Sequence, residues 1–379
     1  MKVLVATEKP FAKAAVNGIR EIVEKNGTPD IEKKIVEGTG DEAQESDTSE
    51  GKVGDVVDYK VTVEIQPGHS GYVVTDTFSK GLTYNDDLVI TLEGVAVTQG
   101  EGTYTATSST STETGETILT INFDDNYVYD TLTTDENGAA INSTLILTYS
   151  ATINEDAVIV DAGNPNTVKL TYDNDKTLDD TVVTYTYGID IFKYTKGASE
   201  DEKKPLAGAK FELKDSENNV VKFSKVENSD PSDHNVYIVD EDGDAELETP
   251  ESGYIYLKGL AAGVYKLTET KEPSGYNKLK GDVTITVTAV KDSNGELAGT
   301  YTVKAEYDGN EMEVGSHSGH VYGSKNQTVD EIDILNNSGT ELPSTGGVGT
   351  YVFTIAGTAI IATAMILFFL KRRKNMAEE

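Results

Sequence analysis

The chain has 379 residues and a formal net charge of −33 at pH 7, from 65 acidic and 32 basic residues. Phosphate binding depends on Lys and Arg, so this charge excludes nucleic acid as an expected partner. The sequence has no cysteine, and disulfides therefore cannot stabilise the fold.

The first 28 residues differ from the rest of the chain. Met1–Asn26 is not a secretory signal, because the run Lys2–Ala6 is too short for an apolar region and charged residues follow it at once. Residues 1–11 instead resemble the opening strand of a phosphoglycerate dehydrogenase, over too little of the chain to bring that activity with it. We expect residues 1–28 to be an atypical segment, foreign to the body of the chain or left by a truncation.

The body of the chain has a hydrophobic period of two, which is typical of β-strands with one buried face. In one stretch, apolar residues alternate with polar ones at Val57, Tyr59, Val61, Val63 and Ile65. Turn signals such as Asn137-Gly138 separate further runs of this kind. We therefore predict an all-β body of sandwiches, with no amphipathic helix after residue 30.

A domain boundary is predicted near Gly188. The strand-like runs Val182–Tyr187 and Ile189–Lys193 follow each other without a linker rich in Pro, Gly or Ser. We expect two Ig-like sandwiches, over residues 29–187 and 188–340, that stack end to end as a stiff rod.

Three polar residues of the second half share a strand face with apolar neighbours. Strand parity places Lys193, Glu269 and Asn336 on the faces of Ile189 and Ile191, Tyr265 and Leu267, and Ile332 and Ile334. The alternative is that they are edge-strand residues that pair with water or with one another. Taken together, they predict that an amine, a carboxyl group and an amide enter one core.

Such burial predicts a chemical reaction, because an unpaired buried charge is so costly that the group neutralises instead. Lys193 would lose its proton and become a nucleophile, while Glu269 would keep its proton and donate a hydrogen bond. The amine could attack the Asn336 side-chain carbonyl, polarised by Glu269, and release ammonia. The protein would act once on itself, so we predict neither an enzyme acting on other molecules nor a cofactor.

Two other clusters are poor candidates for metal sites. His317 and His320 are three residues apart, without a third ligand, and we expect a loop there. Asp240–Asp244 has its glycine misplaced for a calcium loop, and we expect a charged hairpin.

The segment 341–379 carries three features in a fixed order: the pentapeptide Leu342–Gly346, an apolar run Tyr351–Leu370 and a basic cluster Lys371–Lys374. A helix of about 20 residues spans about 30 Å, the thickness of a bilayer's hydrocarbon core. The run therefore predicts a C-terminal transmembrane helix. The basic cluster should stay on the cytoplasmic side, which places the rest of the chain outside the cell.

The pentapeptide Leu-Pro-x-Thr-Gly, with a span and a basic tail, resembles the sorting signal of Gram-positive cell-wall proteins. This resemblance implies recognition of Leu342 and Pro343 by the transpeptidase sortase and cleavage between Thr345 and Gly346. The Thr345 carbonyl would pass to an amine of a peptidoglycan precursor or to a lysine of a neighbouring pilin subunit. The protein would then be covalently attached to the cell wall at the cell surface, after transient membrane insertion through 351–370.

The second half resembles the collagen-adhesin B-type (Cna-B-like, SpaA-like) repeat of Gram-positive pilins. The matching segments are 205–213, 259–265 and 269–276. The resemblance implies that Glu269 promotes an isopeptide bond between Lys193 and Asn336, rather than Asn337.

The first half resembles the fimbrial isopeptide-forming domain, related to the collagen-adhesin A-type (Cna-A-like) fold. The matching segments are 31–35, 53–55, 74–84 and 164–168. Strand parity selects one residue from each ambiguous pair: Lys33 shares a face with Ile31 and Ile35, Asp76 with Val74 and Phe78, and Asn166 with Val168 and Leu170. Together with the resemblance, this predicts a bond from Lys33 to Asn166 assisted by Asp76, and Lys34 is the alternative nucleophile. Each bond would join the first strand of its domain to the last.

These features predict a cell-wall-anchored pilus, or fimbrial, structural subunit. The alternative is a monomeric wall-anchored adhesin that binds a host or partner ligand. An enzyme displayed on the wall is a third reading, for which the sequence offers no site. Shaft-forming pilins usually carry a Tyr-Pro-Lys motif, and none of the nine prolines is followed by lysine. The lysine that would join subunits is therefore not assigned.

Overall fold

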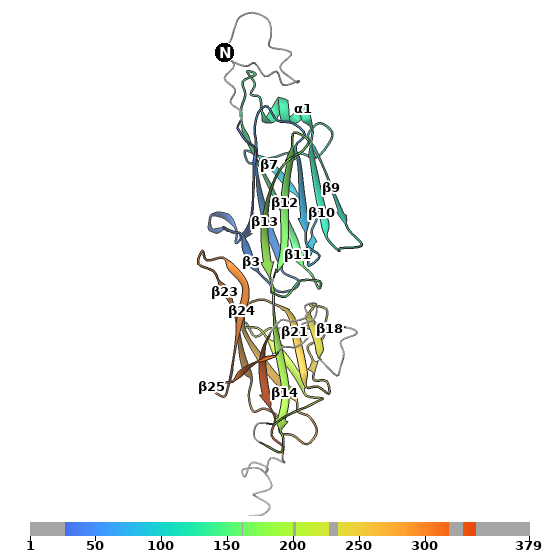
Figure 1. Cartoon of the computed structure of the whole chain (residues 1–379), viewed down its shortest axis with the longest axis vertical. Helices are drawn as coiled ribbons and strands as arrows, with labels where there is room; N and C mark the ends of the chain where they lie inside the picture. The colour runs from blue at the N-terminus through green and yellow to red at the C-terminus, as the bar shows by residue number, and fades with distance from the viewer. Residues whose placement is uncertain (1–26, 161, 200–201, 227–233, 318–328, 339–379) are drawn as a thin grey trace, which may run out of the picture.

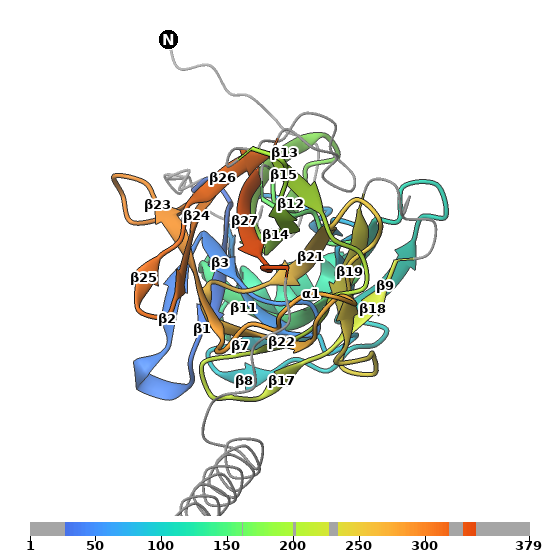
Figure 2. The same cartoon turned by 90° about the horizontal axis from the view of Figure 1, so that it is seen from below.

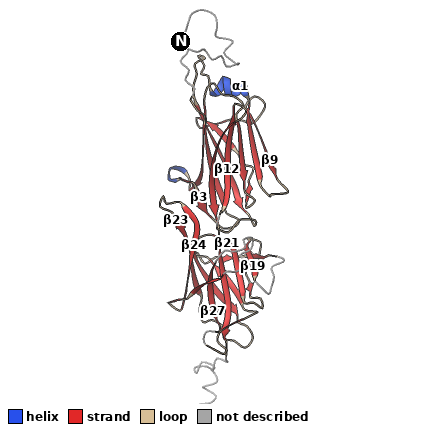
Figure 3. Ribbon diagram, viewed as in Figure 1, coloured by secondary structure: helices blue, strands red, loops and turns tan. Residues whose placement is uncertain are grey.

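The structure is a computed structural model that describes residues 27–160, 162–199, 202–226, 234–317 and 329–338. Strands dominate it and form two β-sandwiches stacked end to end (Figure 1, Figure 3). We call strands β1 to β13 the N-terminal sandwich and strands β14 to β27 the C-terminal sandwich. The predicted all-β class with two tandem sandwiches is confirmed.

The N-terminal sandwich packs one sheet of order β2-β1-β4-β11-β7-β8, with β6 beside β11, on a sheet of order β3-β13-β12-β5-β10-β9. Its pairs are antiparallel except β3 with β13. The strands are β1 (Asp30–Glu37), β2 (Gln44–Ser46), β3 (Thr48–Glu50), β4 (Val56–Ile65), β5 (Val73–Phe78), β6 (Leu82–Tyr84), β7 (Val89–Leu92), β8 (Val95–Ala96), β9 (Tyr104–Thr110), β10 (Thr117–Phe123), β11 (Ser143–Ile153), β12 (Asn164–Tyr172) and β13 (Lys176–Tyr185).

The C-terminal sandwich packs a sheet of order β18-β19-β21-β14-β27-β26, with β15 beside β14, on a sheet of order β17-β16-β22-β23-β24-β25, with β20 beside β16. The pairs β14 with β27 and β19 with β21 are parallel. The strands are β14 (Tyr187–Lys196), β15 (Lys203–Pro205), β16 (Lys210–Lys214), β17 (Val220–Val221), β18 (Phe223–Lys225), β19 (Asn235–Val239), β20 (Leu247–Glu248), β21 (Tyr254–Leu260), β22 (Gly263–Lys271), β23 (Val283–Lys291), β24 (Leu297–Tyr307), β25 (Asn310–Glu311), β26 (Val314–His317) and β27 (Val329–Leu335).

Alternation in the sequence explains which side chains enter the cores. On β4, the five apolar residues named above are at most 6% exposed, while the residues between them face outward. In the described part of the chain, helical turns are short: η2 (Gly40–Glu42), α1 (Asp125–Tyr127) and the π-helical η3 (Val128–Leu132). None of these helices is long and apolar enough to cross a membrane. The predicted span Tyr351–Leu370 lies outside the described residues.

The two sandwiches meet through a junction with direct contacts. Only Thr186 separates β13 from β14. The Val53 backbone N–H donates to the Gly259 carbonyl at 2.9 Å, and Val53 packs against both cores. The Leu297 N–H, at the start of β24, donates to Thr48 Oγ1 on β3 at 2.9 Å. These contacts support an end-to-end stack. When the molecule is seen from below, along its long axis, the two sandwiches overlap (Figure 2).

Candidate cross-linking sites

In the C-terminal sandwich, pairing of the first and last strands brings two of the predicted residues together. Lys193 on β14 is in register with Ile334 on the parallel strand β27, and Asn336 follows the end of β27. Glu269 reaches the same point from β22 in the opposite sheet. All three polar residues are at most 1% exposed, so the parity argument placed each of them inside the core.

The three side chains of this C-terminal site are in direct contact. Lys193 Nζ lies 2.5 Å from Asn336 Oδ1 and 3.3 Å from Glu269 Oε1. Asn336 Nδ2 donates to the same Glu269 oxygen at 2.8 Å, and the Leu279 backbone N–H donates to Glu269 Oε2 at 2.7 Å. The amine therefore touches the amide it would attack, and a backbone donor holds the acid in place.

One expected detail is wrong in this geometry. We expected the Glu269 acid to polarise the Asn336 carbonyl, but Glu269 contacts the amide nitrogen, while the carbonyl oxygen faces Lys193. A carboxyl oxygen that contacts both the amine and the amide nitrogen can carry a proton from one to the other. Glu269 is thus placed beside the leaving group.

Burial makes Lys193 a better nucleophile. Loss of hydration lowers its pKa to about 8, and attraction to Glu269 opposes this change. A lysine with this pKa is neutral in about a tenth of molecules at pH 7, compared with fewer than about one in a thousand at the ordinary pKa. The site therefore supplies a neutral amine under mild conditions.

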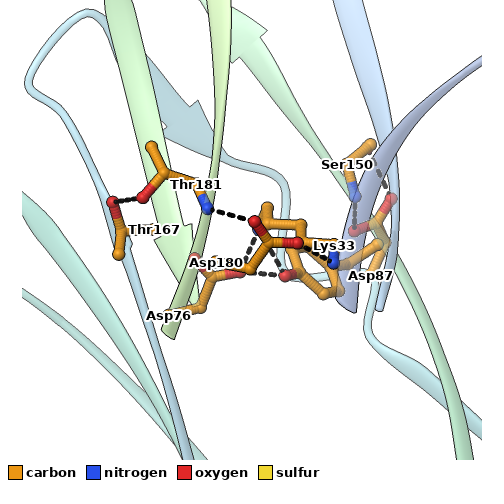
Figure 4. A network of polar contacts seen from close by, with 8 residues as sticks. Lys33, Asp76, Asp87, Ser150, Thr167, Asp180 and Thr181 are labelled. Atoms are coloured by element: carbon orange, nitrogen blue, oxygen red, sulfur yellow. Dashed lines mark hydrogen bonds and ion pairs between the residues drawn. The ribbon is translucent and has the colours of Figure 1, made fainter. Parts of the chain in front are cut away.

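In the N-terminal sandwich, the predicted lysine and acid meet across the two sheets. Lys33 on β1 points inward, and its Nζ lies 2.6 Å from Asp76 Oδ2 on β5 (Figure 4). The same amine lies 2.7 Å from the Tyr149 hydroxyl on β11, which donates a hydrogen bond to Asp76 Oδ2. Lys33 and Asp76 are at most 1% exposed and Tyr149 is 4% exposed.

The third predicted residue of this N-terminal site, Asn166, is buried nearby but makes no hydrogen bond. It lies on β12, where Val168 is in register with Asp76, so Asn166 and Asp76 are diagonal neighbours on one face. Asn166 is fully buried beside the Tyr59 hydroxyl, and neither amide atom makes a hydrogen bond of good geometry with the described residues. The structure therefore brings Lys33 and Asp76 into contact and leaves the amide beside them unpaired.

Low polarity around the N-terminal site shifts both of its charged groups. Loss of hydration lowers the pKa of Lys33 against the attraction of Asp76, and it raises the pKa of Asp76 against the attraction of Lys33. The amine also lies 4.6 Å and 4.8 Å from the ring centres of Tyr59 and Tyr149. Both shifts favour a neutral amine and a neutral acid.

The alternative nucleophile Lys34 points away from this core. Its Nζ lies 2.6 Å from Asp47 Oδ1, and its side chain is 26% exposed. The hydrogen bond that Lys34 donates to Asp47 raises the pKa of Lys34, which favours the charged form. A charged surface lysine is a poor nucleophile.

Sequence reasoning missed Tyr149 and misplaced one strand. Tyr149 continues the inward-facing series Leu145 and Leu147 on β11, so strand parity alone would have found it. We expected each bond to join a first strand to a last strand, which fits β14 and β27. In the N-terminal sandwich this is wrong, because β13 follows the strand of Asn166; a bond there would link one sheet to the other.

The other motifs singled out from the sequence form no metal site among the described residues. Asp240–Asp244 forms a turn in which the Gly243 N–H donates to the Asp240 carbonyl. Within the described ranges, no group of three or more His, Cys, Asp or Glu residues is placed to hold a metal ion. His320 and the sorting residues Leu342, Pro343, Thr345 and Gly346 lie outside the described residues.

Comparison with known families assigns these two halves and the C-terminus. Residues 53–176 match a model described as a Gram-positive pilin backbone subunit 2, Cna-B-like domain. Residues 191–303 match a prealbumin-like fold domain, SpaA, and residues 334–375 match the LPXTG cell wall anchor motif. The chain belongs to the Gram-positive, LPXTG-anchored pilin subunits. The Cna-B-like description of the first half differs in subtype from the A-type resemblance, within the same all-β class.

One curated protein resembles this pilin in sequence, and two solved structures resemble it in fold. This pilin is 26% identical to the trypsin-resistant surface T6 protein of Streptococcus pyogenes over 416 aligned positions, which cover 93% of this chain and 70% of the relative. The pilus backbone RrgB of Streptococcus pneumoniae has a similar fold, with a TM-score of 0.53, 16% identity and coverage of 82% of this chain and 100% of the other. The 35 kDa C-terminal fragment of the major pilin GBS80 of Streptococcus agalactiae gives a TM-score of 0.51, with 23% identity over 69% and 91% of the two chains.

Several predictions from sequence are therefore confirmed. The pilin is a structural subunit and not an enzyme, and it is covalently attached to the cell wall at the cell surface. Its partners are sortase, the cell wall and neighbouring pilin subunits.

Proposed function

We propose that this pilus subunit strengthens itself with two isopeptide bonds, Lys193 to Asn336 and Lys33 to Asn166, promoted by Glu269 and Asp76. The observation that carries the proposal is the 2.5 Å contact between Lys193 Nζ and Asn336 Oδ1, in a core where Glu269 touches both groups.

The C-terminal reaction begins with a proton transfer from the Lys193 ammonium to Glu269. The neutral amine then attacks Cγ of Asn336, and the bond from Cγ to Nδ2 breaks after Glu269 protonates that nitrogen. Of the three ammonium protons, one stays on the new amide nitrogen, one leaves with ammonia and one stays on Glu269. The 2.8 Å contact from Asn336 Nδ2 to Glu269 Oε1 supports this route, because the acid adjoins the leaving group.

The N-terminal reaction uses the same groups in another starting arrangement. Lys33 begins on Asp76 and Tyr149, and Asn166 begins unpaired. Attack requires the lone pair of the neutral amine to face Cγ of Asn166. Among the described residues, Asn166 makes no hydrogen bond that would have to break, which supports this step.

The bonds would give the shaft mechanical strength. A cross-link that closes a loop of about 100 residues can contribute about 4–5 kcal/mol by restricting the unfolded chain. In the C-terminal sandwich, the bond would tie neighbouring strands β14 and β27 together, so tension could not shear them apart. We propose domain limits of 29–187 and 188–340, each enclosing one bond, with 1–28 as a separate segment and 341–379 as the sorting signal.

Sortase processing would then assemble the subunits. We propose cleavage between Thr345 and Gly346 after recognition of Leu342 and Pro343, with transfer of the Thr345 carbonyl to a subunit lysine or a wall precursor. The LPXTG model match over residues 334–375 supports this.

The alternative proposal is a monomeric adhesin whose N-terminal sandwich binds a host ligand. A sortase-dependent ladder on denaturing gels, absent from a strain without the sortase, would favour the pilus subunit. A single wall-linked band would favour the adhesin.

The intact mass of the purified ectodomain tests the two bonds. Each bond removes one ammonia, so the expected mass is that of the chain less two ammonia molecules. Digestion should yield one peptide pair with Lys33 and Asn166 and another with Lys193 and Asn336. A mass equal to that of the plain sequence would overturn the proposal.

A further inference from the structure

The acids of the two sites are held in different ways. Glu269 receives a backbone N–H on Oε2 and contacts both the amine and the amide through Oε1. Asp76 accepts hydrogen bonds on Oδ2 from Lys33 and Tyr149, and its Oδ1 has no hydrogen-bond partner in the described part of the chain. The Tyr149 hydroxyl therefore holds the Asp76 carboxyl group, as the Leu279 backbone N–H holds that of Glu269.

The geometry points to Tyr149 as a positioning residue for the Lys33–Asn166 bond, a role that rests on the proposed function. Its hydroxyl accepts from Lys33 Nζ and donates to Asp76 Oδ2. The three polar atoms form a closed ring of hydrogen bonds in a core where Tyr149 is 4% exposed. Such a ring fixes both the direction of the amine and the role of each carboxyl oxygen.

The ring determines which oxygen of Asp76 carries the proton. The proton from Lys33 passes to Oδ2, the oxygen that Lys33 contacts. A half-turn of the carboxyl group then presents the unprotonated oxygen to the two donors of the ring, which suits a carbonyl oxygen, and moves the protonated oxygen to the Oδ1 position. Oδ1 is the unpaired atom, and Asn166, also unpaired, lies diagonal to Asp76 on the neighbouring strand. Tyr149 thus leaves a donor free for the amide nitrogen that must depart.

The ring also orients the nucleophile. A neutral amine has two N–H groups and one lone pair. When its N–H groups point to Asp76 and Tyr149, the lone pair points away from both and is available to the buried amide of Asn166. The electron pair then forms the bond to Cγ of Asn166, and the bond from Cγ to Nδ2 breaks as Oδ1 protonates that nitrogen.

The test compares two tyrosines of the same core. Tyr149→Phe removes the bridging hydroxyl and keeps the ring. Tyr72→Phe is the matched control, because Tyr72 is fully buried in the same core and its hydroxyl bonds to the Gln66 backbone instead of to the reacting groups. Full-length chains are captured in urea after a brief cell-free synthesis and diluted into buffers of different pH. Mass spectrometry then follows ammonia loss and the Lys33–Asn166 peptide pair over time.

We expect Tyr149→Phe to slow formation of the Lys33–Asn166 pair by at least about tenfold, as loss of a hydrogen bond to a charged group implies. Bond formation in Tyr72→Phe, and formation of the Lys193–Asn336 pair in the same molecules, should keep nearly the wild-type rate. Without the Tyr149 donor, the Asp76 pKa rises further, so the acid limb of the rate profile should move to higher pH. If Tyr149 only filled space in the core, its loss would leave the acid limb of the pH–rate profile unchanged.

Equal rates for the two variants, or an unshifted pH profile, would overturn the role of Tyr149 and leave the bond itself intact. Wild-type chains without the Lys33–Asn166 pair would overturn both this role and the proposed bond. Circular dichroism checks folding of each variant. If Tyr149→Phe does not fold, Tyr149→Gln carries the test, because its amide can donate and accept; it should react faster than Tyr149→Leu.

Discussion

The two cores contain the same three kinds of group, but they differ in which pair is in contact. In the C-terminal sandwich, the amine of Lys193 touches the amide of Asn336, and the backbone of Leu279 anchors the acid. In the N-terminal sandwich, the amine of Lys33 touches the acid and a tyrosine, and the amide stands apart.

The topology of the strands explains this difference. Lys193 lies on β14, and Asn336 directly follows the adjacent parallel strand β27 of the same sheet, so the backbone itself brings them together. The N-terminal pair comes from opposite sheets, and side chains must span the core. Tyr149 fills part of that span. The same lysine, acid and asparagine can therefore form different geometries, depending on whether the lysine and the asparagine belong to one sheet or to two.

The largest expected effect is on bond formation in variants of the two acids. Glu269→Ala should slow the Lys193–Asn336 bond by at least about 100-fold, as removal of a general acid–base does. Asp76→Ala should do the same for Lys33–Asn166, and each variant should spare the other site. Peptide mapping of purified protein measures both bonds at once. Loss of ammonia from the C-terminal site in Glu269→Ala would contradict the assignment.

The next effect is on stability, tested by two neighbouring asparagines. Asn336→Ala prevents the bond and should lower the free energy of unfolding of the C-terminal sandwich by about 4–5 kcal/mol. Asn337→Ala is the control, because Asn337 is exposed. Urea unfolding followed by circular dichroism provides the measurement, with Asn166→Ala as the counterpart in the other sandwich. Equal stability of Asn336→Ala and Asn337→Ala would rule out a cross-link at Asn336.

A smaller effect concerns pH. Because burial lowers the pKa of Lys193 to about 8, the neutral fraction of the amine falls about tenfold for each pH unit below that value and levels off above it. Formation of the C-terminal bond should therefore slow as pH falls from about 8 to about 6. At the N-terminal site, burial favours both neutral partners, so we expect a flatter profile. Refolding urea-captured chains at each pH gives both rates, and a C-terminal rate that does not change with pH would contradict the role of the neutral amine.

Strand parity predicted most of the fold and of the two cores from sequence. Alternation in β4 identified the buried face, and the same rule placed Lys33, Lys193 and Glu269 inside. Parity gives only the face of a strand, however, and not its neighbours. It could not predict that Asn166 lies across the core from Lys33, or that Glu269 meets the amide nitrogen, because those facts depend on strand order and side-chain rotation.

The smallest expected effect separates two adjacent lysines and tests parity directly. Lys34→Ala should leave the N-terminal bond intact and change the free energy of unfolding by less than about 1 kcal/mol, because its ion pair with Asp47 lies at the surface. Lys33→Ala should abolish that bond, since it removes the only amine in contact with Asp76 among the described residues. Intact mass and urea unfolding of the two variants give the comparison. A missing ammonia loss in Lys34→Ala would mean that β1 presents its other face to the core, and the inward direction of Lys33 would then be wrong.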